Sequence, residues 1–69
     1  MISHAYSIIS ETTEDRFDET DNLEEAVRIA RSLARERRIG DPVSIEHRGM
    51  VIRQLVLMSN GQVAELEIV

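Results

Sequence analysis

The segment Asn22–Arg38 constrains the fold most, because its apolar residues recur at the spacing of an amphipathic helix. At about 100° per residue, one face collects Leu23, Ala26, Val27, Ala30, Leu33 and Ala34. Asp21 or Asn22 supplies an N-cap, and a glutamate follows three residues after either of them. Gly40 suits the left-handed position after a helix, and Pro42 prevents continuation. The sequence therefore predicts a helix with one face against a core.

Alternating apolar residues predict extended segments on both sides of this helix. Ile2–Ile9 is expected to be a strand, with Ile2, Tyr6 and Ile8 on one face. Ser10–Asp21 is expected to be an acidic loop, either throughout or interrupted by a short strand over Asp15–Asp18, and Val43–Val69 is expected to be three strands. The prediction is one two-layer α+β domain over residues 1–69, with one helix packed on a mostly antiparallel sheet. Its order is strand, loop or short strand, helix and three strands.

Two glycine turns set the expected register of the last three strands. A two-residue turn is predicted at Asn60-Gly61, because both residues tolerate positive φ. The resulting core side holds Arg53, Leu55, Leu57, Ala64, Leu66 and Ile68. The earlier turn is predicted as a three-residue loop, His47–Gly49, because a two-residue loop would turn Val43 and Ile45 away from the core.

Arg53 is the one charged residue on that predicted core side. A buried charge is very costly without a partner. We therefore expect the guanidinium either to reach water at the rim or to pair with a carboxylate of the acidic loop or with Glu46.

The other side of the predicted sheet is half apolar, and a single helix cannot cover both faces. It carries Met50, Ile52, Val56, Met58, Val63 and Val69. A chain this short buries only about 60% of the surface that its unfolded form exposes, and association stabilises the folded state. We therefore expect a two-fold homodimer through this sheet face or through a strand edge.

Charge is divided unevenly along the chain, whose formal net charge is −5. Residues 11–25 hold eight acidic residues and one arginine, whereas residues 26–38 hold five arginines and one glutamate. On the predicted helix, one flank carries Glu24 at its head and then the arginine row, defined as Arg28, Arg31, Arg35 and Arg38. Glu24 and Arg28 are spaced to form an ion pair.

Three interpretations of the arginine row remain open. It is a solvated face neutralised by the acidic loop, a docking surface for an acidic protein partner or a second subunit, or a set of phosphate contacts for RNA or DNA. The negative net charge and the presence of only two aromatic residues disfavour nucleic acid.

Motifs for catalysis, metals and membranes are missing from the sequence. The chain has no cysteine, and Asp15, Asp18 and Asp21 step by three, whereas an EF-hand loop alternates by two and needs glycine at its sixth position. His4 and His47 stand singly, and no nucleophile motif or phosphate loop is present. We therefore expect no catalysis, cofactor or metal. No apolar run approaches about 20 residues and no secretion signal is apparent, which predicts a cytoplasmic protein without membrane contact.

The run Leu-Glu-Glu-Ala-Val-Arg-Ile-Ala-Arg, followed by a glycine-turn hairpin, resembles in outline two kinds of small domain. One is the bacterial antitoxin that pairs with an mRNA-cutting toxin, and the other is similar to the double-stranded-RNA-binding fold. The glycine-containing strand pairs of those antitoxins and a lysine-rich helix start are not present, so no family is assigned. The leading expectation is a non-enzymatic interaction or regulatory module. The alternative is an antitoxin-like RNA- or DNA-binding regulator that uses the arginine row.

Overall fold

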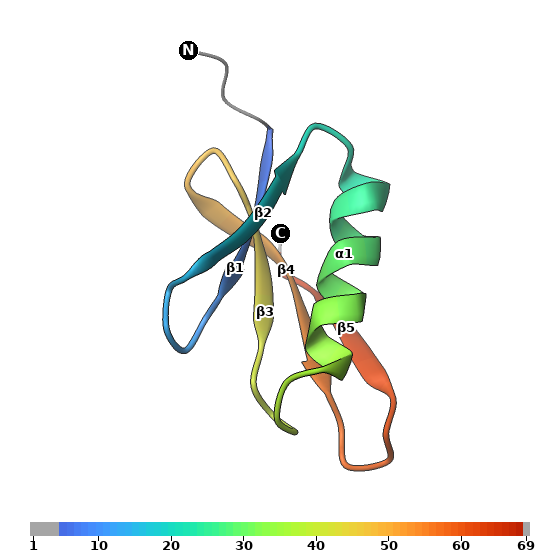
Figure 1. Ribbon diagram of the computed structural model, residues 1–69. Coiled ribbons are helices and arrows are strands. Elements are labelled where there is room, and N and C mark those ends of the chain that lie inside the picture. Colours follow the sequence, from blue (N-terminus) through green and yellow to red (C-terminus); the bar gives the residue numbers. More distant parts are fainter. Residues whose placement is uncertain (1–4, 69) are drawn as a thin grey trace.

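The computed structural model describes residues 5–68, in which one helix lies across one face of a five-stranded antiparallel sheet (Figure 1). The strands are ordered β2-β1-β3-β4-β5 across the sheet. The elements are β1 (Tyr6–Ser10), β2 (Arg16–Thr20), α1 (Leu23–Arg35), β3 (Val43–His47), β4 (Met50–Leu57) and β5 (Val63–Glu67). This arrangement confirms the predicted two-layer α+β fold.

The core lies between α1 and the three central strands. The helix contributes the fully buried Ala26, Ala30 and Ala34, and the sheet contributes the fully buried Ile8, Val43, Ile45 and Leu55. Because an alanine side chain is a single methyl group, this seam brings the helix backbone close to the branched side chains of the sheet. Half-buried Leu23, Val27 and Leu33 pack along the border of the seam.

The helix begins as predicted and ends early. The Asn22 side-chain oxygen accepts a hydrogen bond from the backbone N–H of Glu25 at 3.2 Å, which caps the first turn. The last helical residue is Arg35, so the predicted end at Arg38 is wrong. The positions that continue the alanine seam beyond Ala34, three and four residues on, are both arginines. No further apolar residue therefore holds another turn against the sheet.

The chain after α1 turns back toward the sheet at Gly40. Its φ is +84°, the left-handed conformation that the sequence predicted, but it lies in a turn closed by a 3.0 Å bond from Asp41 N to Arg38 O. The Gly40 N–H also bonds Leu57 O of β4 at 2.9 Å. The helix has 13 residues, and no helix within residues 5–68 is long and apolar enough to cross a membrane.

The second half of the segment predicted as an acidic loop contains the five-residue edge strand β2. It pairs antiparallel with β1 and contains a register shift near Ile9, which leaves only residues 11–15 as a connection. Edge strands with one wet side and a bulge lack clean alternation of apolar and polar residues. That is why only a four-residue piece around Phe17 was expected to be extended.

The β3–β4 connection is a two-residue turn, so the predicted three-residue loop is wrong. Arg48 and Gly49 have φ values of 54° and 79°, and His47 pairs directly with Met50. The pairing then shifts by one residue, because Glu46 lies opposite Val51 whereas Ile45 lies opposite Arg53. This bulge in β4 returns Val43 and Ile45 to the core side, as expected, by a different route.

The β4–β5 connection contains three residues, and the predicted two-residue turn is also wrong. Met58 N bonds Gln62 O at 2.8 Å and Gly61 N bonds Met58 O at 2.9 Å. Only Gly61 takes positive φ, at +85°, since Asn60 is not among the residues with positive φ. Leu57 therefore lies opposite Val63 instead of Ala64. This slip of one residue exchanges the two sides of β5.

Candidate functional site

The sheet face opposite α1 is not covered by any other element within residues 5–68 (Figure 1). Its half over β1 and β3 is mostly polar. Ser44 is fully buried there, donates to Glu11 Oε2 at 2.5 Å and accepts from Gln54 Nε2 at 3.4 Å. The Ser44 hydroxyl is therefore satisfied, and half-buried Ile9 lies opposite it on the same face.

The half over β4 and β5 is mostly apolar, with Gln54 opposite Leu66, and we call its apolar residues the outer patch. Val56 lies opposite Ala64, and residues two positions away on each strand share their face. Leu66 and Ile68 are 48% and 50% exposed, and Met58 at the hairpin end is 45% exposed. The outer patch therefore consists of Val56, Met58, Ala64, Leu66 and Ile68.

The slip in β5 changes which of the predicted dimer-face residues lie on this side. Val56 and Met58 belong to the outer patch. Val63 packs against the core instead, Ile52 at the bulge also contacts the core, and Met50 lies opposite His47 in the β3–β4 ladder. Val69 lies outside the described residues. Leu66 and Ile68, which were expected in the core, take the vacated places, because the three-residue turn inverts the strand.

The four residues of the arginine row do not form one continuous basic surface on α1. Arg31 Nη2 lies 2.8 Å from Glu65 Oε1 of β5. Arg28 pairs with Glu25 at 3.7 Å instead of with Glu24. Arg35 is exposed, and Arg38 follows the helix end. The described ion pairs of this row are therefore made with Glu25 and Glu65, which belong to α1 and β5.

Arg53 lies on the core side, as the sequence predicted, and its carboxylate partners come from β5. Its side chain is 18% exposed, and the guanidinium lies 3.7 Å from Glu65 and 3.9 Å from Glu67. It also donates to Ile52 O at 3.2 Å. The partners are therefore neither Glu46 nor the acidic loop. The slip of β5 explains this difference, because it brings both glutamates to the helix side.

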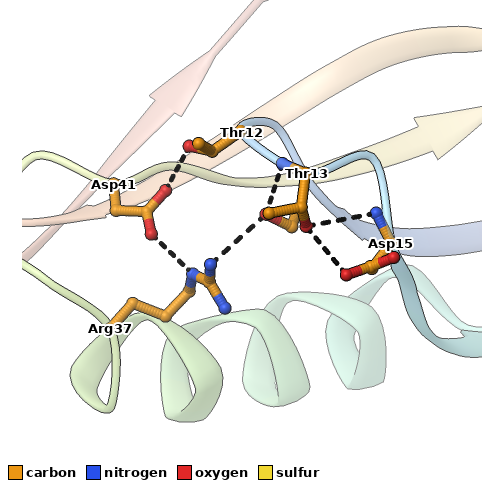
Figure 2. Close-up of polar contacts among 6 residues, drawn as sticks. Thr12, Thr13, Asp15, Arg37 and Asp41 are labelled. Atoms are coloured by element: carbon orange, nitrogen blue, oxygen red, sulfur yellow. Dashed lines mark hydrogen bonds and ion pairs between the residues drawn. The ribbon is translucent and has the colours of Figure 1, made fainter.

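The most connected polar cluster was not singled out from the sequence. Figure 2 shows Arg37 between the β1–β2 connection and the segment before β3: its Nε donates to Asp41 Oδ2 at 2.9 Å and its Nη2 to Ser10 Oγ at 3.4 Å. Asp41 Oδ1 also accepts from Thr12 Oγ1 at 2.5 Å. The Arg37 guanidinium lies 5.2 Å from the centroid of the Phe17 ring. The cluster ties the β1–β2 connection to the α1–β3 connection, which indicates a structural role.

The same cluster predicts an acid-sensitive contribution to stability. The Thr12 hydroxyl bond, with help from Arg37, lowers the pKa of Asp41 below its ordinary value of 3.8. Because the folded pKa is the lower one, the stabilisation is complete above pH 3.8 and is lost as the pH falls through the folded pKa. Asp41→Asn should therefore be less stable than the wild type near neutral pH, and the difference should shrink in acid.

Urea unfolding followed by circular dichroism across this pH range measures the difference directly. Glu36→Gln, at an exposed carboxylate, serves as the control and should show no comparable convergence. A gap between wild type and Asp41→Asn that stays constant into acid would contradict the assignment.

Of the two histidines considered from the sequence, only His47 lies within residues 5–68, where it makes structural contacts. His47 stacks on Tyr6 with ring centroids 4.8 Å apart, and its Nδ1 lies 2.8 Å from Ala5 O. His4 lies outside the described residues. No group of three histidine or acidic side chains gathers there to hold a metal ion. Each buried side-chain polar atom in this part of the chain has a hydrogen-bond partner.

Comparison with known proteins gives no relative. No family model matches the chain, and no match was found among the curated proteins or the solved structures compared with it. The functional argument therefore depends on the surfaces described above.

Proposed function

We propose that this protein is a small, non-enzymatic, cytoplasmic interaction module that forms a homodimer through its outer patch. Contiguous apolar patches on the surface of a folded domain often mark protein interfaces. A domain of this size also gains stability from self-association.

The observation that carries the proposal is the exposure of Leu66 and Ile68, each about half accessible, on a face with no covering layer. Val56 and Ala64 lie beside them and extend the apolar area across two strands. At the centre of the sheet, the buried Ser44 hydroxyl is already bonded to Glu11 and Gln54, so the exposed apolar residues over β4 and β5 are the part that gains most from contact with a second molecule.

Sedimentation equilibrium of the wild type and of Leu66→Lys tests the proposal. The wild-type mass should rise with concentration from 7.9 kDa toward twice that value. Leu66→Lys should raise the dissociation constant roughly 30-fold or more, because it places a charge in a desolvated interface. Ile39→Lys is the matched control, since Ile39 is exposed in the turn after α1 and is not one of the outer-patch residues, and it should dimerise like the wild type.

A wild-type mass that stays at that of one chain at millimolar concentration would contradict the dimer. Equal loss of association in Leu66→Lys and Ile39→Lys would place the interface elsewhere.

Nucleic-acid binding has weaker support. Arg31 is engaged by Glu65, and glutamates flank Arg28 in the first turn of α1. The exposed Arg35 and Arg38 remain, on a chain with a net charge of −5. Binding of labelled RNA or duplex DNA that weakens steeply with salt and disappears in Arg28→Glu plus Arg35→Glu would favour this rival over the proposed module.

A further inference from the structure

The free edge of β5 presents backbone groups that no strand within residues 5–68 pairs with. The β4–β5 ladder is framed by bonds from Met58 N to Gln62 O and from Ile68 N to Ile52 O, at 2.8 and 2.9 Å. Antiparallel strands alternate their bonding direction, and this ladder has no register shift. Residues 62, 64, 66 and 68 therefore point their backbone groups at β4, and residues 63, 65 and 67 point theirs outward.

The two edges of the sheet differ in how well they can receive another strand. The β2 edge contains a bulge and carries an ion pair at 2.7 Å between Arg16 and Glu19. The β5 edge is regular, with apolar Leu66 and Ile68 on its outer side. A bulge interrupts the regular backbone ladder that an added strand needs, so the β5 edge is the more receptive one.

Charge on the helix side of β5 restricts what can pair there. Glu65 and Glu67 alternate with the apolar residues of the outer side, and Glu67 lies directly opposite Arg53. In this cross-strand pair, the charge is therefore positive on β4 and negative on β5. A strand added beyond β5 continues the pattern favourably if it places a cation opposite each glutamate, because opposite charges stabilise cross-strand pairs.

A second copy of β5 does not meet this requirement. The antiparallel register that pairs all five residues sets Glu65 against the same residue of the copy. Shifting this register by two positions toward the C-terminal end pairs only residues 65–67 and sets Glu65 against Glu67. Shifting it by two positions toward the N-terminal end pairs only residues 63–65. Like charges directly opposite each other destabilise a sheet. The edge is therefore better suited to a different sequence than to itself.

We propose that the β5 edge binds an extended segment of a partner protein in which arginine or lysine alternates with aliphatic residues. The segment adds an antiparallel sixth strand, with its cations beside Glu65 and Glu67 and its aliphatic side chains beside Leu66 and Ile68. The proposal goes beyond self-association, because it uses the backbone edge of the sheet instead of the face.

The probe is a nine-residue, end-blocked peptide that alternates arginine and valine, titrated into the full chain by calorimetry. A peptide of the same composition with its arginines grouped at one end is the control for simple charge attraction. In an antiparallel strand, the residues opposite Glu65 and Glu67 bond the edge through their own amides. N-methylation of the arginine amides should therefore weaken binding roughly 10-fold, whereas N-methylation of the valine amides should not.

Charge reversal on the protein tests the choice of partner. Glu67→Arg should weaken binding of the arginine–valine peptide roughly five-fold and improve binding of a glutamate–valine peptide. Equal binding of the grouped peptide, or no effect of N-methylation of the arginine amides, would overturn the proposal. Protection of the residue 63, 65 and 67 amides from hydrogen exchange without peptide would also overturn it, because it would indicate pairing between copies.

These outcomes are separable from those of the proposed dimer. Titrations are made at a concentration where sedimentation gives the mass of one chain, so edge binding is measured whether or not the outer patch associates. Peptide binding by Val56→Lys, a variant of the outer patch in β4 and not in the edge strand, with its dependence on the arginine amides retained at that concentration, supports the edge even if the dimer fails.

Discussion

Replacement of Ile45 by alanine should lower the free energy of unfolding by about 2–5 kcal/mol. Ile45 is fully buried in the centre of β3, opposite Ile8 on one side and Arg53 on the other. The substitution removes buried methyl and methylene groups and leaves a cavity that the sheet cannot close. Small single domains have few kcal/mol of stability to lose, so much of the variant should be unfolded at 25 °C.

Urea unfolding at equilibrium measures the change, and Ile39→Ala is the matched control. Ile39 is 62% exposed in the turn after α1, so the same chemical substitution should change the free energy by no more than about 0.5 kcal/mol. Similar effects at both positions would contradict the assignment of the core.

Replacement of Ala30 by leucine should lower the free energy of unfolding by about 1–3 kcal/mol, although leucine is a good helix former. Ala30 is the central member of the alanine seam and is fully buried against the sheet. A leucine there forces the helix away from Ile45 and Leu55, and an interior packed at close to crystal density has no room for the added atoms.

Ser32→Leu on the same helix is the control, because Ser32 is exposed. It should leave stability unchanged or raise it slightly through helix propensity. A stabilised Ala30→Leu variant would indicate unfilled space under α1, and the description of the helix–sheet contact would then be wrong.

The sequence was sufficient to predict the layers of this fold, and the reason is local. Asn22 and the alanine seam define where the helix begins and which face it buries, and both depend only on residues close together in the chain. Its end was not predictable from the same signals. The turn at Gly40 was visible in the sequence, but the helix stops earlier because arginines follow Ala34 on the seam.

Strand register could not be predicted from turn residues alone. Asn60-Gly61 favours a two-residue turn, yet the chain uses three residues with only Gly61 left-handed. In the β3–β4 hairpin, a two-residue turn and a bulge at Ile52 together place Val43 and Ile45 on the core side, as a three-residue loop without a bulge would also do. Bulges depend on packing against other strands, so no local pattern reveals them.

These errors in the predicted register also changed which residues were expected on each candidate surface. One helix leaves one sheet face uncovered, as the sequence predicted, but Val63 left that face when β5 inverted, and Met50 and Ile52 left it because of the β3–β4 turn and bulge. Arg37 was overlooked because its importance comes from Ser10, Phe17 and Asp41, which are distant in sequence or outside any helical pattern. The pairing of Arg31 with Glu65 likewise joins elements 34 residues apart.

The central claim is that the outer patch, and not the helix surface, is where this protein meets a second copy of itself. A dilution series of two-dimensional amide NMR spectra tests it residue by residue. We expect concentration-dependent shifts at Val56, Ala64, Leu66 and Ile68, with the exposed face of α1 unchanged. Shifts confined to Arg28, Arg35 and their neighbours, or spectra identical at every concentration, would contradict the account.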